Sequence, residues 1–87
     1  MAIVRVEFLG ISRERAGTPE LEVEADTLGQ LLAVLERRFP SFDGVVNGGR
    51  LSSAFRANLN GDRFVSDPLT RLSAGDSLLI LSADAGG

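Results

Sequence analysis

The sequence predicts an α+β two-layer sandwich, in which one main helix packs on one face of a mixed β-sheet. Three observations predict this architecture. Two segments near the start of the chain alternate apolar and polar residues, as half-buried strands do. Residues 27–39 then repeat their leucines with the period of a helix. Further strand-like segments follow, and the last of them, SLLILS, is almost continuously apolar, which is typical of a central strand.

Chain length and composition predict one small domain without catalytic residues of its own. The 87 residues are enough for a single core. We expect that core in residues 1–81, followed by a flexible C-terminal tail at residues 82–87 that ends in Gly-Gly. The chain has no cysteine and no histidine. It therefore lacks thiol nucleophiles, disulfides, the usual general base and the commonest transition-metal ligands, and we expect no metal site.

Charge and hydropathy indicate a cytoplasmic protein. The net charge is −3, whereas a protein that binds nucleic acid needs a basic surface. Arg5 and Glu7 interrupt the apolar stretch at the start of the chain, so this stretch has the pattern of neither a signal peptide nor a membrane span. We expect cytoplasmic localisation, with neither nucleic acid nor a membrane as a partner.

The first two strands are predicted to pair as an antiparallel hairpin. They occupy residues 2–9 and 20–25, and a loop at residues 10–19 joins them because Gly10, Gly17 and Pro19 punctuate that stretch. Successive side chains of a strand point to opposite faces. In the first strand the predicted core set is Val4, Val6 and Phe8, and the outer set is Ile3, Arg5, Glu7 and Leu9.

The helix is the clearest element of the sequence. Thr27 followed by Gln30 is a capping box, which marks the helix start. Pro40 ends the helix. After a glycine-rich excursion with a short helical turn, residues 54–60 form the third predicted strand. The leucines and phenylalanine that form the apolar stripe of the helix are Leu28, Leu31, Leu32, Leu35 and Phe39.

The remaining strands complete the order β-β-α-β-β-β. A tight turn at Asn60-Gly61 leads into a short fourth strand. The final strand is best placed beside the first, in parallel, with the helix on the crossover side. This is the β-grasp arrangement. It leaves one face of the sheet without a helix to cover it.

Apolar side chains are predicted on that uncovered face. Alternation places Leu9, Leu79 and Leu81 there, with Phe64 beside them. Such a cluster with a charged rim suggests a docking surface, although a small sheet also leaves some apolar residues exposed for want of cover. Glu20, Glu22 and Glu24 alternate along a strand as a solvated row does, and no activated nucleophile is present.

The C-terminal glycines suggest a chemical role for the chain end. Gly86 and Gly87 have no Cβ, so their backbone fits a narrow channel and could bring its carboxylate to the catalytic centre of a partner. The alternative is an idle chain end without a chemical role. A free carboxylate reacts only after activation, most simply by an ATP-using enzyme.

Four stretches together resemble the ubiquitin-like sulfur carriers of the MoaD/ThiS family, over nearly the whole chain. They are VRVEFLGISRERAG, DTLGQLLAVLERRFP, LNGDRFVSDPLTRLSAGDSLLIL and the final AGG. The succession NG, DPLT and GDS before an apolar strand is characteristic of the small subunit of molybdopterin synthase and its relatives.

The resemblance implies a sulfur carrier. An E1-like enzyme of the MoeB/ThiF type would adenylate the Gly87 carboxylate with ATP and magnesium, and sulfur transfer would give a thiocarboxylate. The chain would bind no cofactor itself. It would donate sulfur as the small subunit of a molybdopterin synthase-like complex with a MoaE-like large subunit, or to another acceptor enzyme. Besides Gly86 and Gly87 of the tail, the residues expected to meet partners are Leu9, Phe64, Leu79, Leu81 and Ala85.

The acceptor stays open at this point. Many members of the molybdenum pathway have prolines just before the tail, where this chain has SADAGG. Carriers for cysteine, thiamine, tRNA thiolation or specialised metabolites share the fold and the ending. Two alternatives remain beside a sulfur carrier: a ubiquitin-like modifier conjugated through Gly87, and an interaction module that uses only the sheet face.

Overall fold

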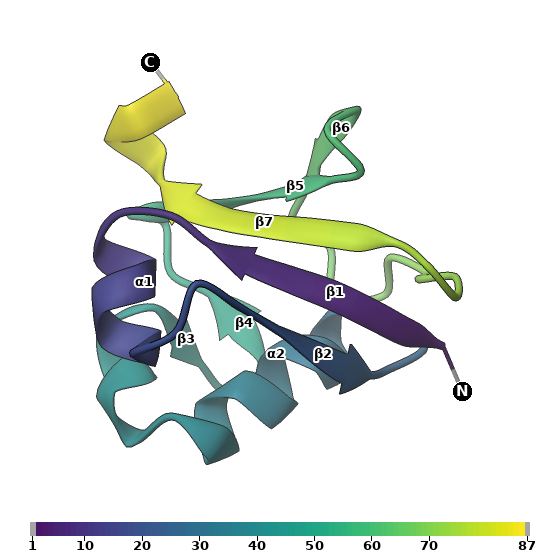
Figure 1. Cartoon of the computed structure of the whole chain (residues 1–87), viewed down its shortest axis with the longest axis horizontal. Coiled ribbons are helices and arrows are strands. Elements are labelled where there is room, and N and C mark those ends of the chain that lie inside the picture. The colour runs from purple at the N-terminus through teal and green to yellow at the C-terminus, as the bar shows by residue number, and fades with distance from the viewer. Residues whose placement is uncertain (1, 87) are drawn as a thin grey trace.

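The computed structural model describes the backbone of residues 2–86 and the side chains of residues 2–84. It confirms a two-layer α+β fold in which a mixed sheet packs on one main helix (Figure 1). The elements in chain order are β1 (Ile3–Phe8), α1 (Ile11–Ala16), β2 (Glu20–Glu24), α2 (Leu28–Arg38), the 3₁₀ turn η1 (Pro40–Gly44), β3 (Val46–Asn47), β4 (Arg50–Leu51), β5 (Phe55–Leu59), β6 (Arg63–Val65), β7 (Ser77–Ser82) and the 3₁₀ turn η2 (Ala83–Gly86).

The last strand lies at the centre of the sheet. The strand order is β2-β1-β7-β5-β6. β7 pairs in parallel with β1 and antiparallel with β5, while β2 and β6 pair antiparallel at the two edges. The predicted parallel pairing of the first and last strands is therefore confirmed, and with it the β-grasp arrangement.

The core lies between α2 and one face of the sheet. The register sets Val6 beside Leu78 and Phe8 beside Ile80, so the inward residues of the two central strands form continuous rows. Phe8 also makes edge-to-face contacts with Phe39 and Phe42, at ring-centroid distances of 5.9 and 5.6 Å. The fully buried side chains on the sheet and the helix include Val4, Val6, Leu28, Leu31, Leu32, Leu35, Leu78 and Ile80.

The start of α2 is capped as the sequence predicts, with one change of partner. The Thr27 hydroxyl accepts a hydrogen bond from the Gln30 backbone N–H at 3.3 Å. The Gln30 side-chain oxygen accepts from the N–H of Asp26 at 2.9 Å, one residue before the position of a standard capping box. Both bonds satisfy backbone donors at the point where the chain leaves the sheet and enters the helix.

The predicted loop at residues 10–19 is wrong in one respect, because the short helix α1 occupies its middle. Gly17 adopts the left-handed conformation, with φ of 74°, and its N–H donates to the Arg13 carbonyl at 2.9 Å. This is the usual C-terminal cap of a helix. Gly17 therefore ends a helix, and the residues before it, ISRERA, contain nothing that breaks one.

The glycine-rich excursion contains the predicted helical turn, η1, and also a two-stranded hairpin of β3 and β4 that the sequence did not predict. Gly48 and Gly49 make its turn with φ of 61° and 74°. The Glu36 carboxylate on α2 accepts hydrogen bonds from both of their N–H groups, at 3.2 and 3.1 Å. The hairpin is thus fixed to the helix by a charged acceptor.

The boundary of the C-terminal segment differs slightly from the predicted one. β7 includes Ser82, the first residue of the predicted tail, and the Ala83 N–H donates to the Ala54 carbonyl at 2.8 Å. Residues 83–86 then form η2. That the tail is flexible stays a prediction. Within residues 2–86, no helix combines the length and the apolar character that crossing a bilayer would require.

The Thr27 cap is expected to contribute about 1 kcal/mol to the free energy of unfolding. Thr27→Ala removes the acceptor for the Gln30 N–H and should lower that free energy by about this amount in urea denaturation. Thr27→Ser keeps the hydroxyl and should stay within about 0.5 kcal/mol of the parent. Equal losses in the two variants would show that the methyl group, and not the hydrogen bond, matters.

Candidate functional site

The candidate site is the sheet face that α2 does not cover. Cross-strand pairing sets Leu79 between Glu7 of β1 and Asn58 of β5, and Asn58 beside Phe64 of β6. In the next row Leu81 lies beside Arg56. The Leu9 N–H donates to the Ile80 carbonyl at 3.0 Å, so Leu9 also lies near the C-terminal end of β7. We call Leu9, Phe64, Leu79 and Leu81 the outer patch.

The four residues of the outer patch differ in exposure. Leu9 is 44% exposed and Phe64 is 51% exposed, whereas Leu81 is only 8% exposed. Leu79 is intermediate. Leu81 is thus buried although it lies outside the core cluster. The free chain therefore offers Leu9 and Phe64 as its main apolar contacts, and contact with a partner stays a prediction for all four.

Charged side chains border the outer patch on both sides. On the side of β1 and β2, the Arg5 Nε lies 3.2 Å from a Glu20 carboxylate oxygen, and both side chains are half exposed. On the side of β5 and β6, the Arg56 guanidinium lies 4.9 Å from the centre of the Phe64 ring, a cation–π distance. Alternation places Arg56 on this face, but nothing in the sequence indicates that it stacks on Phe64.

Ser12 fixes the end of β7 from which the tail leaves. Its side chain is fully buried. The Ser12 hydroxyl donates to the Ile80 carbonyl at 2.7 Å and accepts from the Leu9 N–H at 3.1 Å. One hydroxyl therefore ties α1 to the ends of both β1 and β7. Sequence reasoning missed this residue because a loop was expected there, and a serine between glycines gives no signal of burial.

The tail begins where these contacts end. Ala83 is held by its hydrogen bond to Ala54, and beyond that anchor a fully extended residue 84–87 segment would span about 14 Å. Ala85 and Gly86 lie in the backbone turn η2, and Gly87 lies outside the described residues. Figure 1 shows the C-terminal end of the chain at the opposite end of β7 from the N-terminus. No cluster of three or more metal-ligating residues occurs in the described part of the chain.

A model of the ThiS family matches residues 6–87. The chain belongs to the ThiS family. Its structural neighbours are ubiquitin-like sulfur carriers and modifiers. The family match spans both the outer patch and the tail.

Solved structures support this assignment. The small archaeal modifier protein 1 of Methanosarcina acetivorans is 26% identical, with a TM-score of 0.79, covering 100% of this chain and 98% of that one. A chain of the BexX/CysO complex of Amycolatopsis orientalis is 26% identical, with a TM-score of 0.77, covering 97% and 99%.

The fold also occurs in a two-subunit complex. A chain from the complex of subunits 1 and 2 of the molybdopterin-converting factor of Helicobacter pylori is 22% identical, with a TM-score of 0.70, covering 98% of this chain and 99% of that one. At 22% identity, this likeness shows only that the two chains share a fold. Comparison with curated protein sequences gives no significant match.

Removing the Ser12 hydroxyl should loosen the end of the sheet. Ser12→Ala deletes the buried acceptor and donor, and we expect a loss of about 1–2 kcal/mol in the free energy of unfolding. We also expect faster amide hydrogen exchange at Leu9. The control is Ser73→Ala, an exposed serine in a loop, which should leave both quantities unchanged. Equal behaviour of the two variants would contradict the assigned role.

Proposed function

We propose that the chain is a sulfur carrier whose Gly87 carboxylate is adenylated by an E1-like enzyme and then converted to a thiocarboxylate. One observation carries this proposal: in a member of the ThiS family, an uncovered apolar patch lies along the central strand β7, and the Gly-Gly tail leaves from the end of that strand. A partner docked on the patch is within reach of the tail.

The chemistry uses the chain end as substrate. A Gly87 carboxylate oxygen attacks the α-phosphorus of ATP, and the bond to pyrophosphate breaks. In the resulting acyl adenylate a sulfur nucleophile equivalent to hydrosulfide attacks the carbonyl carbon, and AMP leaves with the electron pair of the broken C–O bond. The products are a thiocarboxylate, AMP, pyrophosphate and one proton. ATP and magnesium belong to the activating partner, which we expect in the cytoplasm.

The residues of this chain bind and deliver the reactive end. Leu9, Phe64 and Leu79 supply apolar contact area, and Leu81 supports them from the central strand. Ala85 and Gly86 are small enough to pass a narrow channel, and glycine at residue 87 lets the backbone approach the reacting groups closely. No acid–base group of the chain takes part.

For the acceptor, we propose a molybdopterin synthase-like complex with a MoaE-like large subunit. The likeness in fold to the Helicobacter pylori complex supports this choice. The likeness to a chain of the BexX/CysO complex equally fits a carrier for another sulfur-containing product, such as cysteine, thiamine, thiolated tRNA or a specialised metabolite.

A second candidate function is protein modification through Gly87. The likeness to a small archaeal modifier protein, at 26% identity over the whole chain, favours it. Conjugation needs the same adenylation step and then attack by a lysine amine of the target. Covalent adducts of higher mass that resist thiol reductants would distinguish this function from sulfur transfer.

Deleting Gly87 should abolish sulfur loading. With a cognate activating enzyme, ATP, magnesium and a sulfide source, the full chain should gain the mass difference between sulfur and oxygen in intact-mass spectrometry. The truncated chain should gain nothing and keep its thermal stability, because the deletion removes no residue of the core. Sulfur loading of the truncated chain would overturn the proposal.

A charge in the outer patch should weaken docking and spare the chemistry. Phe64→Asp should raise the KM of the activating enzyme for the carrier about tenfold, with kcat unchanged, because an interface contact worth about 1.4 kcal/mol is lost. The matched control is Leu69→Asp. Leu69 is 77% exposed, and its neighbour Thr70 bonds to α2, on the other side of the sheet. An equal rise in both variants would count against the outer patch.

A further inference from the structure

A pocket of about 450 Å³ opens at the edge of the sheet beside the outer patch. Ala57 lies on the inner face of β5 between Phe55 and Leu59, is 1% exposed and forms part of the pocket floor. Leu51 and Val65, which pack against the core, line the pocket as well. The pocket floor thus adjoins the hydrophobic core.

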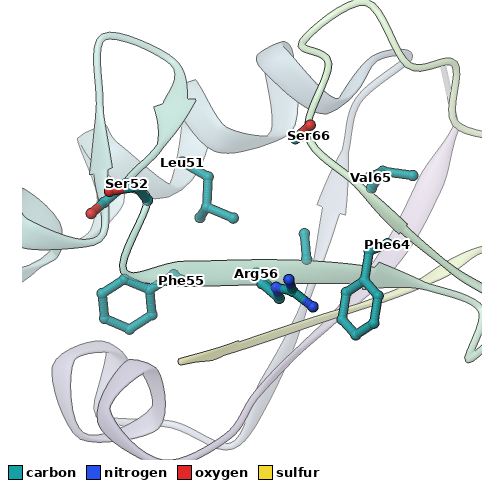
Figure 2. A pocket seen from close by; sticks show the side chains of 9 residues that line it. Leu51, Ser52, Phe55, Arg56, Phe64, Val65 and Ser66 are labelled. Atoms are coloured by element: carbon teal, nitrogen blue, oxygen red, sulfur yellow. The ribbon is translucent and has the colours of Figure 1, made fainter. Parts of the chain in front are cut away.

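The mouth of the pocket carries a positive charge. Arg56 and Phe64 both line it, and Figure 2 shows Phe55 and Phe64 on either side of Arg56 along β5. The serines Ser52, Ser53 and Ser66 are the other polar residues of the lining, which contains no carboxylate. Within residues 2–86 the only ion pair joins Arg5 and Glu20. The cation–π contact with Phe64 holds the Arg56 guanidinium, and its charge has no carboxylate partner.

The edge strand β6 is shorter than β5. β6 pairs only with Ala57–Leu59 of β5, so Phe55 and Arg56 extend past the end of β6. The Phe55 N–H donates to the Ser52 carbonyl and Arg56 pairs with Leu81 of β7, so an added strand has no free ladder here. An extended segment of another protein can instead cross the edge between the inner and outer residues of the pocket lining. Neighbouring side chains of such a segment point to opposite faces. One points inward over Ala57, and the next points outward toward Arg56.

We infer that this pocket binds an extended segment of a partner protein in which an apolar side chain adjoins a carboxylate. The apolar side chain fills the hollow over Ala57, and the carboxylate pairs with Arg56. Phe64 belongs to both surfaces, so the pocket extends the area that a partner on the outer patch can cover. The site involves no residue of the tail, and it can be tested apart from the proposed chemistry at Gly87.

The test is an NMR titration of the isotope-labelled full chain. The probe is a pentapeptide with blocked ends, with leucine at its centre, aspartate next to it and threonine elsewhere. We expect saturable shifts of the amide signals of Ala57, Val65 and Ser66. Replacing the aspartate of the peptide by asparagine should weaken binding about tenfold, because a charge-assisted bond is lost. Replacing its leucine by alanine should weaken binding at least as much.

The matched protein variants are Arg56→Gln and Arg63→Gln. Arg63 is an exposed arginine of β6 outside the pocket lining. Arg56→Gln should abolish the preference for aspartate over asparagine, and Arg63→Gln should preserve it. Three results would overturn the inference. They are the absence of a saturable shift with the peptide, equal binding of the aspartate and asparagine peptides to the parent chain, and binding of the free small acid 4-methylpentanoate in place of a peptide. Concentration-dependent shifts at the pocket without peptide would instead identify a second copy of the chain as the occupant and also overturn it.

Discussion

The parallel pairing of β1 with β7 is the constraint on which the rest of the structure depends. It brings the two ends of the sequence to the centre of one sheet, and the register aligns their inward residues over α2. A parallel pair needs a crossover connection, and the helix α2 lies in that connection. β7 is the central strand, so the tail leaves from a strand that is paired on both sides.

The single main helix explains why one face stays open. One helix of eleven residues covers one face of a five-stranded sheet, and a chain of 87 residues has little left to cover the other. Leu9 and Phe64 therefore stay half exposed. The pocket at the end of β6, where Ala57 pairs with Val65, is likewise left without a covering element. The apolar contacts available to partners are thus a consequence of how this small domain is built.

The sequence predicted those parts that repeat with a regular period. Alternation located β1, β2 and β5, and the leucine stripe located α2 with its Thr27 cap. The helix α1 was missed because six residues are too few to show a helical period and because Gly10 and Gly17 resemble loop residues. The hairpin of β3 and β4, with two residues in each strand, is likewise too short to show alternation.

The candidate site was predictable only in part for a similar reason. Alternation assigns a residue to a face, and it placed Leu79 and Leu81 on the outer one. Alternation does not report exposure, so the sequence did not predict that Leu81 is buried. The buried hydroxyl of Ser12 and the stacking of Arg56 on Phe64 join segments that no local pattern connects. The chemistry at Gly87 depends on a partner enzyme and rests on family membership.

The central claim is that the carboxylate at residue 87 is the reactive group, and ATP–pyrophosphate exchange tests it most directly. The chain would be prepared with either a free acid or an amide at Gly87 and mixed with the activating enzyme, ATP and labelled pyrophosphate. The free acid should support exchange of label into ATP, and the amide should support none while retaining the fold. Exchange with the amide form, or none with the free acid, would contradict the claim.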